Sequence, residues 1–206
     1  MLVIWGRNSS VNVQKVLWCC EEAGIAYRRV DAGLQYGVVN TPEYRAINPN
    51  GLVPTIDEDG FTLWESNTIV RYLASKYAAG SLWPEDLRAR ARADQWLDWQ
   101  NSTYWPAMRP LFVGMVRSDP AKRDPAALEQ HRLATFKVLQ VVDAHLQSNA
   151  YLGGDTFTMG DIGVGCGVWR WMGMDIERPP LPNLQRWFDL LAQRPAYRTA
   201  VMRPLE

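Results

Sequence analysis

Residues 48–73 read NPNGLVPTIDEDGFTLWESNTIVRYL, and this stretch decides the fold of the first part of the chain. Two short apolar runs, GLVPTID and FTLW, flank an Asp-Gly turn, which is a strong signal for a β-hairpin. Pro54 cannot donate a backbone hydrogen bond, so it belongs on an edge or at an irregular strand start. Ser66 is predicted to be the N-cap of a helix whose apolar face includes Ile69 and Leu73.

The same stretch leaves backbone polar groups free in two places. Beside Pro54, and especially if the Val53–Pro54 bond is cis, Val53 can offer its N–H and C=O to an extended peptide. The unpaired amides at Ser66 and Asn67 form an anion site suited to a carboxylate, and Glu65 beside them can pair with an ammonium group. Together these groups predict a site for a small peptide. An ordinary hairpin followed by a helix cap is the alternative interpretation.

The residues that precede this hairpin complete an α/β pattern. A strand, LVIW, opens the chain, an apolar helix face follows over residues 13–20, and Gly24 is placed to end that helix. AYRRVDA then predicts a second strand, and a weak helix is expected around residues 43–46. Strand–helix–strand followed by strand–strand–helix is typical of a layered α/β domain, in which we expect a mixed, four-stranded sheet.

The pattern changes after Tyr77, where AAGSLWPED is the best candidate for a linker because it contains Gly and Pro. Apolar residues then recur with helical spacing over residues 87–101, 126–148, 159–171 and 184–193. Pro106 and Pro110 should kink or divide the first of these helices where it continues. We therefore predict an α/β domain over residues 1–78, a linker over 79–86 and an all-α helical domain over 87–206.

One helix start in the second half is unusually well specified. Thr158 as N-cap and Asp161 three residues later form a variant of the capping box, and Phe157 and Ile162 occupy the positions of a hydrophobic staple. We interpret this motif as structural, because it is suited to nucleating a buried helix.

Composition excludes several classes of protein. The chain has 206 residues, 47% of them hydrophobic, with 22 basic and 22 acidic residues, so disorder and a nucleic-acid partner are not expected. Three cysteines, two of them adjacent, predict no disulfide framework and suggest a reducing compartment. No signal peptide and no apolar run of about 20 residues is visible, so we expect a soluble, cytoplasmic protein without a membrane association. His131 and His145 are far apart, and no metal site is predicted.

The turn GRNSSVNVQKV, between the first strand and the first helix, carries the candidate chemistry. Ser9, Ser10 and Asn12 crowd one helix start, although an N-cap requires only one residue. A hydroxyl or amide donor there, together with the helix dipole, would stabilise the thiolate of a bound thiol. Lowering a thiol pKa by about 2 units from ~8.5 converts a few per cent of thiolate at pH 7 into a majority.

Four segments are highly specific when taken as a set: NPNGLVP, ESNTIVRYL, TMGDI and the ending LPNLQRWFDLLAQRPAY. With these segments the chain resembles the cytosolic glutathione transferases over essentially its full length. The resemblance implies a thioredoxin-like N-terminal domain, a helical C-terminal domain, a homodimer, and glutathione as co-substrate. Ser10 lines up with the catalytic serine of the zeta class and the threonine of the bacterial Nu class. Asn12 lines up with the asparagine of the Nu class and the cysteine of the beta class, so the pattern is most similar to Nu.

The resemblance also assigns the parts of the site. Ser10 and Asn12 would hold the thiolate. Val53, next to Pro54, would bind the cysteinyl backbone, and Glu65 and Ser66 would bind the γ-glutamyl end. Leu52 stands where many relatives carry Gln or Lys, so one polar contact is missing. The resemblance assigns no residue to the glycyl carboxylate, and Asn40 and Asn50 are our candidates for it. The walls for the second substrate would come from the first helices of the helical domain and from one later helix: Tyr104, Trp105, Met108, Arg109, Phe112 and Trp169.

Three functions remain open at this point. The preferred one is a glutathione transferase that activates the thiolate for attack on a hydrophobic electrophile. The second is a glutathione-dependent disulfide reductase, which needs no cysteine of the protein. The third is a non-catalytic module that keeps the fold as a scaffold.

Overall fold

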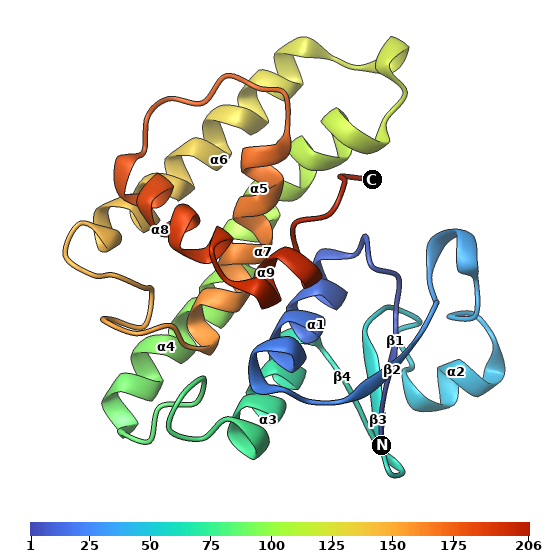
Figure 1. Cartoon of the computed structure of the whole chain (residues 1–206). Coiled ribbons are helices and arrows are strands. Elements are labelled where there is room, and N and C mark those ends of the chain that lie inside the picture. The colour runs from blue at the N-terminus through green and yellow to red at the C-terminus, as the bar shows by residue number, and fades with distance from the viewer.

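The computed structural model describes all 206 residues and consists of a four-stranded sheet followed by a helical bundle (Figure 1). The strands are β1 (Leu2–Trp5), β2 (Tyr27–Val30), β3 (Thr55–Glu58) and β4 (Phe61–Trp64). Their order in the sheet is β2-β1-β3-β4. β1 runs parallel to β2 and antiparallel to β3, and β3 is antiparallel to β4. The predicted mixed, four-stranded sheet is therefore confirmed.

The hairpin of β3 and β4 forms where the sequence places it. Glu58 pairs with Phe61 across a two-residue turn, and the turn residues Asp59 and Gly60 have positive φ angles of 53° and 92°. Two positive φ angles match the right-handed twist of the flanking strands, which is why Asp-Gly is favoured here. The Asp57 carboxylate also accepts a hydrogen bond from the Gly60 N–H at 2.8 Å. The turn therefore sets the register of the hairpin.

Three helices accompany the sheet. They are α1 (Val11–Ala23), α2 (Pro42–Ile47) and α3 (Ser66–Tyr77). Gly24 ends α1 in the left-handed conformation with φ 64°, as predicted. Ser66 differs from its prediction: Glu65 occupies the N-cap position of α3, and Ser66 is the first helical residue. The difference of one residue arises because Glu65, not Ser66, adopts the non-helical backbone conformation at this start.

The second half of the chain is helical, as predicted. Its α-helices are α4 (Leu87–Trp99), α5 (Trp105–Phe112), α6 (Pro125–Leu146), α7 (Met159–Gly173), α8 (Pro182–Ala192) and α9 (Pro195–Ala200). The four helical segments expected from the apolar spacing correspond to α4, α6, α7 and α8. The short helix α9 was not predicted. No helix of the structure combines the length and apolarity needed to cross a membrane.

Pro106 and Pro110 divide the helix after α4, but without a loop. A π-helical turn, Gln100–Tyr104, joins α4 to α5, and a second one, Val113–Arg117, follows α5. Pro106 lies in the first turn of α5, where its missing N–H costs least. The wider turns on either side of α5 accommodate the changed hydrogen-bond pattern. The chain therefore stays helical from Leu87 to Arg117 while its helical phase shifts.

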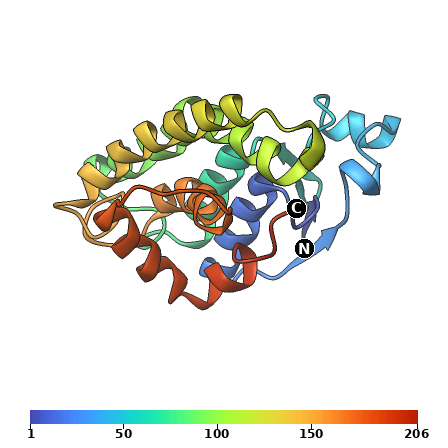
Figure 2. The same cartoon turned by 90° about the horizontal axis from the view of Figure 1, so that it is seen from above.

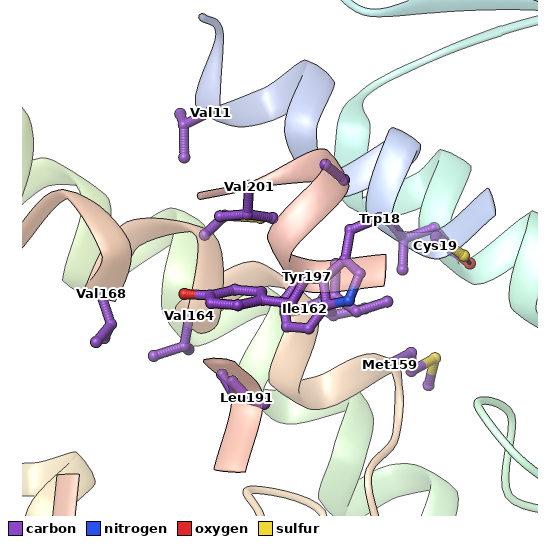
Figure 3. Close-up of a cluster of buried hydrophobic side chains, with 14 of the residues drawn as sticks. Val11, Trp18, Cys19, Met159, Ile162, Val164, Val168, Leu191, Tyr197 and Val201 are labelled. Atoms are coloured by element: carbon purple, nitrogen blue, oxygen red, sulfur yellow. Dashed lines mark hydrogen bonds between the residues drawn. The ribbon is translucent and has the colours of Figure 1, made fainter. Parts of the chain in front are cut away.

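The sheet half and the helical half share one hydrophobic core. α1 packs against α3 on one side and against α7 and α9 on the other. Trp18 of α1 contacts Tyr197 of α9, with ring centroids 4.6 Å apart, and Figure 3 shows these rings among apolar side chains of α7 and α8. A Cβ atom on Gly165 of α7 would lie only 2.8 Å from the Trp18 ring. Figure 2 shows the bundle lying beside the sheet, with α1 between them.

The limits of the two domains stay a proposal. α3 ends at Tyr77 and α4 begins at Leu87, so the predicted linker, residues 79–86, lies between two helices. The continuous core indicates that the two parts are stabilised together and not as separate units. All three cysteines are free and buried.

Candidate active site

A cavity of about 470 Å³ lies between the two halves of the protein. It is enclosed by the turn between β1 and α1, the loop that follows β2, the segment before β3, and the helices α5 and α7. Sixteen residues line it: Arg7, Ser10, Val11, Asn12, Gly33, Leu34, Val39, Asn40, Gly51, Leu52, Val53, Trp105, Arg109, Phe112, Arg117 and Arg170. The cavity therefore brings together Ser10, Asn12, Asn40, Val53, Trp105, Arg109 and Phe112 from the sequence-predicted set.

Ser10 is at the N-cap position of α1, but its hydroxyl does not cap the helix. Its backbone is extended, with φ −79° and ψ 123°, and its carbonyl accepts the Gln14 N–H at 2.9 Å. Neither the Ser10 hydroxyl nor the Asn12 amide forms a hydrogen bond with another residue of the chain. Both side chains line the cavity beside the positive end of the α1 dipole. Two free polar groups are thus available to a ligand at this helix start.

Ser9 has a different role from its neighbours. Its carbonyl accepts a hydrogen bond from Nη2 of Arg170 at 3.0 Å, while Nη1 of Arg170 donates to the Gln14 side chain at 2.8 Å. Arg170 comes from α7 and is only 2% exposed. Burial lowers its pKa to about 10. Arg170 therefore anchors the turn that carries Ser10 from a helix more than 150 positions away in the sequence. A lone arginine within an apolar helix was the only sequence signal for it.

The segment before β3 presents the backbone of Val53 to the cavity. The Val53–Pro54 bond is cis, and neither the N–H nor the C=O of Val53 forms a hydrogen bond within the chain. The neighbouring carbonyl of Leu52 is occupied, since it accepts from the Tyr44 hydroxyl at 2.6 Å and from Nδ2 of Asn48 at 2.9 Å. These contacts hold the segment in place. Pro54 is buried and lies outside the cavity lining.

The start of α3 lies beside a second, more open depression of about 400 Å³. Glu65 and Asn67 line it, together with Thr68, Arg71, Asp98, Asn101 and Ser102. Glu65 has φ 71° and ψ 109°, a conformation that non-glycine residues rarely adopt. Backbone outliers of this kind cluster at ligand sites, where the surrounding structure holds them. The predicted pair Glu65 and Ser66 is therefore not part of the cavity that contains Ser10. Glu65 lines the second depression, whereas Ser66 is buried and lines neither surface.

Lys15 stabilises the start of α3 through hydrogen bonds. It is fully buried, and its Nζ donates to Oγ of Ser66 at 3.3 Å, Oδ1 of Asn67 at 3.1 Å and Oε1 of Gln100 at 2.6 Å. No carboxylate is in contact with it. Burial lowers the pKa of Lys15 to about 7. Lys15 thereby links α1, α3 and the turn after α4, and the sequence contained no clear sign of its burial.

The buried position of Lys15 predicts a pH-dependent stability. In the unfolded chain the amine binds a proton below pH ~10.4, whereas in the folded protein it does so only below about 7. The unfolded state therefore binds more protons between these values, and stability is lost as the pH falls through this window. We expect the free energy of unfolding of wild type, relative to Lys15→Met, to rise by up to roughly 4 kcal/mol between pH 7 and 10.

Urea unfolding at a series of pH values measures this difference. Lys137→Met is the matched control, because Lys137 is exposed and forms no ion pair or hydrogen bond. Its unfolding free energy should follow the wild-type pH profile. The same profile for Lys15→Met would show that Lys15 does not titrate between pH 7 and 10.

Four residues that were predicted to form the second-substrate wall or to bind the glycyl carboxylate lie outside the cavity. Tyr104 and Met108 are fully buried in the core, and neither lines the cavity. Trp169 donates from Nε1 to the Arg203 carbonyl at 2.9 Å and lies outside the cavity lining, and Nδ2 of Asn50 bonds to Asn48, also outside it. The first correction follows from helical phase. The cavity face of α5 carries positions 105, 109 and 112, whereas Met108 and Tyr104, the latter in the π-helical turn before α5, face the core.

Comparisons with known proteins identify the family of the chain. The family description "Glutathione S-transferase, N-terminal domain" matches residues 9–76, and "Glutathione S-transferase, C-terminal domain" matches residues 103–195. Glutathione S-transferase GstB of Escherichia coli (strain K12) is 40% identical over 207 residues, which covers 100% of both chains. Glutathione S-transferase 3 of Zea mays is 33% identical and covers 97% of this chain and 93% of its own.

A solved structure is similar in both sequence and fold. It is the theta-class glutathione S-transferase of the citrus canker pathogen Xanthomonas axonopodis pv. citri with glutathione bound, at 47% identity and a TM-score of 0.97. The match covers 100% of this chain and 99% of that one. That protein is described as theta class, so the similarity to the Nu class stays a prediction. The two family matches together span most of the chain, and the protein therefore belongs to the glutathione S-transferase family.

Proposed function

We propose that the protein is a glutathione transferase whose thiolate site is formed by Ser10 and Asn12. One observation carries the proposal. The side chains of Ser10 and Asn12, at the start of α1, form no hydrogen bonds within the chain and line a cavity together with the free backbone groups of Val53. A related protein of 47% identity has been solved with glutathione bound. A scaffold has no need for free donors that converge on one cavity, so this arrangement favours an enzyme.

Glutathione would lie across both concave surfaces. Its cysteinyl backbone would pair with the N–H and C=O of Val53, as an added strand pairs with a sheet edge. Its γ-glutamyl end would reach the start of α3, where Glu65 can bind the ammonium group and the amides beside Ser66 the carboxylate. The glycyl end would lie near Asn40, which lines the cavity. Asn50 bonds to Asn48 and lies outside the cavity, so it is not part of this proposal.

The chemistry follows from this placement. The thiol of glutathione loses its proton to solvent, and the Ser10 hydroxyl and the Asn12 amide donate hydrogen bonds to the sulfur anion. The sulfur then attacks an electrophilic carbon, a C–S bond forms, and the leaving group departs with the electron pair of the bond that breaks. Trp105 and Phe112 provide apolar walls for the electrophile. We also propose, from the family, a cytoplasmic homodimer.

Disulfide reduction is the second candidate. All three cysteines of the protein are buried, and none lines the cavity. A mixed disulfide would therefore be attacked by the thiolate of glutathione itself, which forms glutathione disulfide and releases the other sulfur as a thiolate. The same Ser10 and Asn12 donors would serve this reaction. Relative rates with an aryl chloride and with a mixed disulfide decide which activity dominates.

Calorimetric titration with glutathione tests the proposal. We expect saturable binding with a Kd at or below about 1 mM, the upper range of typical enzyme constants. S-methylglutathione is the matched control, because it keeps the peptide and cannot form a thiolate. A difference spectrum should show thiolate absorbance at pH 7 with glutathione and none with the control. Absence of binding at millimolar glutathione would instead favour the non-catalytic scaffold.

A further inference from the structure

Four arginine side chains converge on the cavity, and none of them forms a salt bridge with an acidic side chain. Arg7, Arg109, Arg117 and Arg170 line it, and no acidic residue does. Elsewhere in the protein, four arginines are paired with carboxylates: Arg29, Arg71, Arg132 and Arg194. The chain as a whole has equal numbers of basic and acidic residues. The cavity lining is therefore a local concentration of positive charge, which Glu206 partly offsets from outside the lining.

These charges are close enough to oppose one another. Burial and the nearby Arg117 lower the pKa of Arg7, and burial and the nearby Arg109 lower the pKa of Arg117. Glu206 acts in the opposite direction on both groups, and its main-chain oxygen accepts a hydrogen bond from Arg117 at 2.9 Å. Like charges gathered in this way cost free energy, which a bound anion recovers.

Phe112 holds two of the guanidinium groups without neutralising them. The Cζ atoms of Arg117 and Arg170 lie 5.0 and 5.2 Å from its ring centroid. A cation–π contact attracts the cation and leaves its full charge in place. In addition, the Nε atoms of Arg7 and Arg170 are buried and have no hydrogen-bond partner. The site therefore retains both charge and donor capacity.

Glutathione does not account for this charge. As proposed above, it brings two negative groups to the cavity, the thiolate and the glycyl carboxylate, while its γ-glutamyl end lies at the start of α3. Arg7 is on the peptide side, because its Nη1 is 3.0 Å from the position that a Cβ on Gly33 would take, next to Val53. The remaining positive charge is on the α5 side, where Arg109 and Arg117 accompany the Trp105 and Phe112 rings.

We propose that the second substrate is an electrophile with a carboxylate or another anionic group on an aromatic or otherwise apolar body. Arg109 and Arg117 bind the anionic group, since guanidinium groups match planar oxyanions in geometry and charge. Trp105 and Phe112 bind the apolar body. This inference rests on the proposed function, because it assigns the substrate class of the same site.

A matched pair of aryl chlorides tests the inference. The substrates are 4-chloro-3,5-dinitrobenzoate and its uncharged methyl ester, each with glutathione and each normalised to its own uncatalysed rate. In both, the thiolate sulfur forms a C–S bond, the C–Cl bond breaks, and chloride leaves with the electron pair. Wild type should prefer the benzoate by about tenfold or more in kcat/KM, as a charge-assisted contact implies. The preference should decrease with added salt, because Arg109 and Arg117 are partly solvent-exposed.

Two variants test whether Arg109 and Arg117 cause the preference for the benzoate. In Arg109→Gln and in Arg117→Gln, the ratio of kcat/KM for benzoate over ester should fall about five- to tenfold. Arg88→Gln removes the same charge from an exposed position outside the cavity and should keep the wild-type ratio. Thermal unfolding verifies that all three variants fold.

The outcomes separate the two proposals. Equal normalised rates for benzoate and ester in wild type, or an equal loss for both substrates in the variants, overturn the anionic substrate and leave glutathione transfer standing. Failure of both substrates together with no calorimetric binding of glutathione overturns the proposed function, and the substrate class with it.

Discussion

Replacing Ser10 by alanine is expected to lower kcat/KM for glutathione conjugation by about 25-fold at neutral pH. The hydroxyl lines the cavity, does not cap α1 and has no other hydrogen-bond partner in the chain. Removing it deletes a donor to the sulfur anion in a partly enclosed site. A rise of about 2 units in the pKa of the bound thiol corresponds to about 2.7 kcal/mol. The acidic limb of the pH profile of kcat/KM should therefore move to higher pH.

The pH profile distinguishes this role from a structural one. A variant that merely loosens the turn between β1 and α1 lowers the rate at every pH, whereas loss of a thiolate donor lowers it chiefly below the new thiol pKa. Ser10→Thr keeps the hydroxyl and should retain most of the activity. Asn12→Ala is the parallel test of the second free side chain. An unchanged acidic limb in Ser10→Ala with a displaced limb in Asn12→Ala would transfer the role of principal donor to Asn12.

Replacing Asp161 by alanine should destabilise the protein by about 3–5 kcal/mol. The carboxylate is fully buried and accepts three hydrogen bonds: from the Leu152 N–H at 2.8 Å, the Thr158 N–H at 2.9 Å and Nε1 of Trp187 at 2.9 Å. Alanine leaves all three donors buried and unpaired. The expected loss of stability is larger than that of a helix cap alone, because the Asp161 carboxylate also joins α7 to α8 and to the preceding loop.

Asp86→Ala is the matched control for Asp161→Ala. Asp86 caps α4 by accepting the Ala89 N–H at 2.7 Å, but this contact is exposed. Loss of an exposed cap typically costs about 1 kcal/mol. Denaturant unfolding of both variants gives the comparison, and Asp161→Asn, which keeps an acceptor oxygen, should fall between them. Equal unfolding midpoints for the two alanine variants would mean that the three buried bonds add nothing to the cap.

The capping box shows which contacts can be predicted from local sequence. Thr158 and Asp161 are three residues apart, and their reciprocal bonds depend only on helical geometry, so the motif is legible in the sequence. The bonds from Leu152 and Trp187 to the same carboxylate were not predicted, because they depend on how α8 and a loop pack against α7. The motif was identified correctly, but most of its expected energetic weight comes from tertiary contacts.

The wall of the second-substrate site shows a similar limit of prediction from sequence. The sequence places residues 104–112 near the site, but it does not set the rotation of α5 about its axis. The π-helical turn, Gln100–Tyr104, shifts that phase just before α5 begins. As a result Trp105, Arg109 and Phe112 line the cavity, while Tyr104 and Met108 pack in the core. A register shift of one residue turns a side chain by about 100°.

The sequence by itself determined the mixed sheet, its Asp-Gly hairpin, the helix limits at Gly24 and Thr158, and the crowded turn at Ser10. These features depend on backbone preferences and hydrogen bonds between residues a few positions apart. Only the tertiary structure decided that Arg170 anchors the Ser10 turn, that Lys15 is buried beneath α3, and that four arginines share one cavity. The physical reason is that a side chain's charge and hydrogen bonds depend on its neighbours in space, and here the decisive neighbours come from segments far apart in the chain.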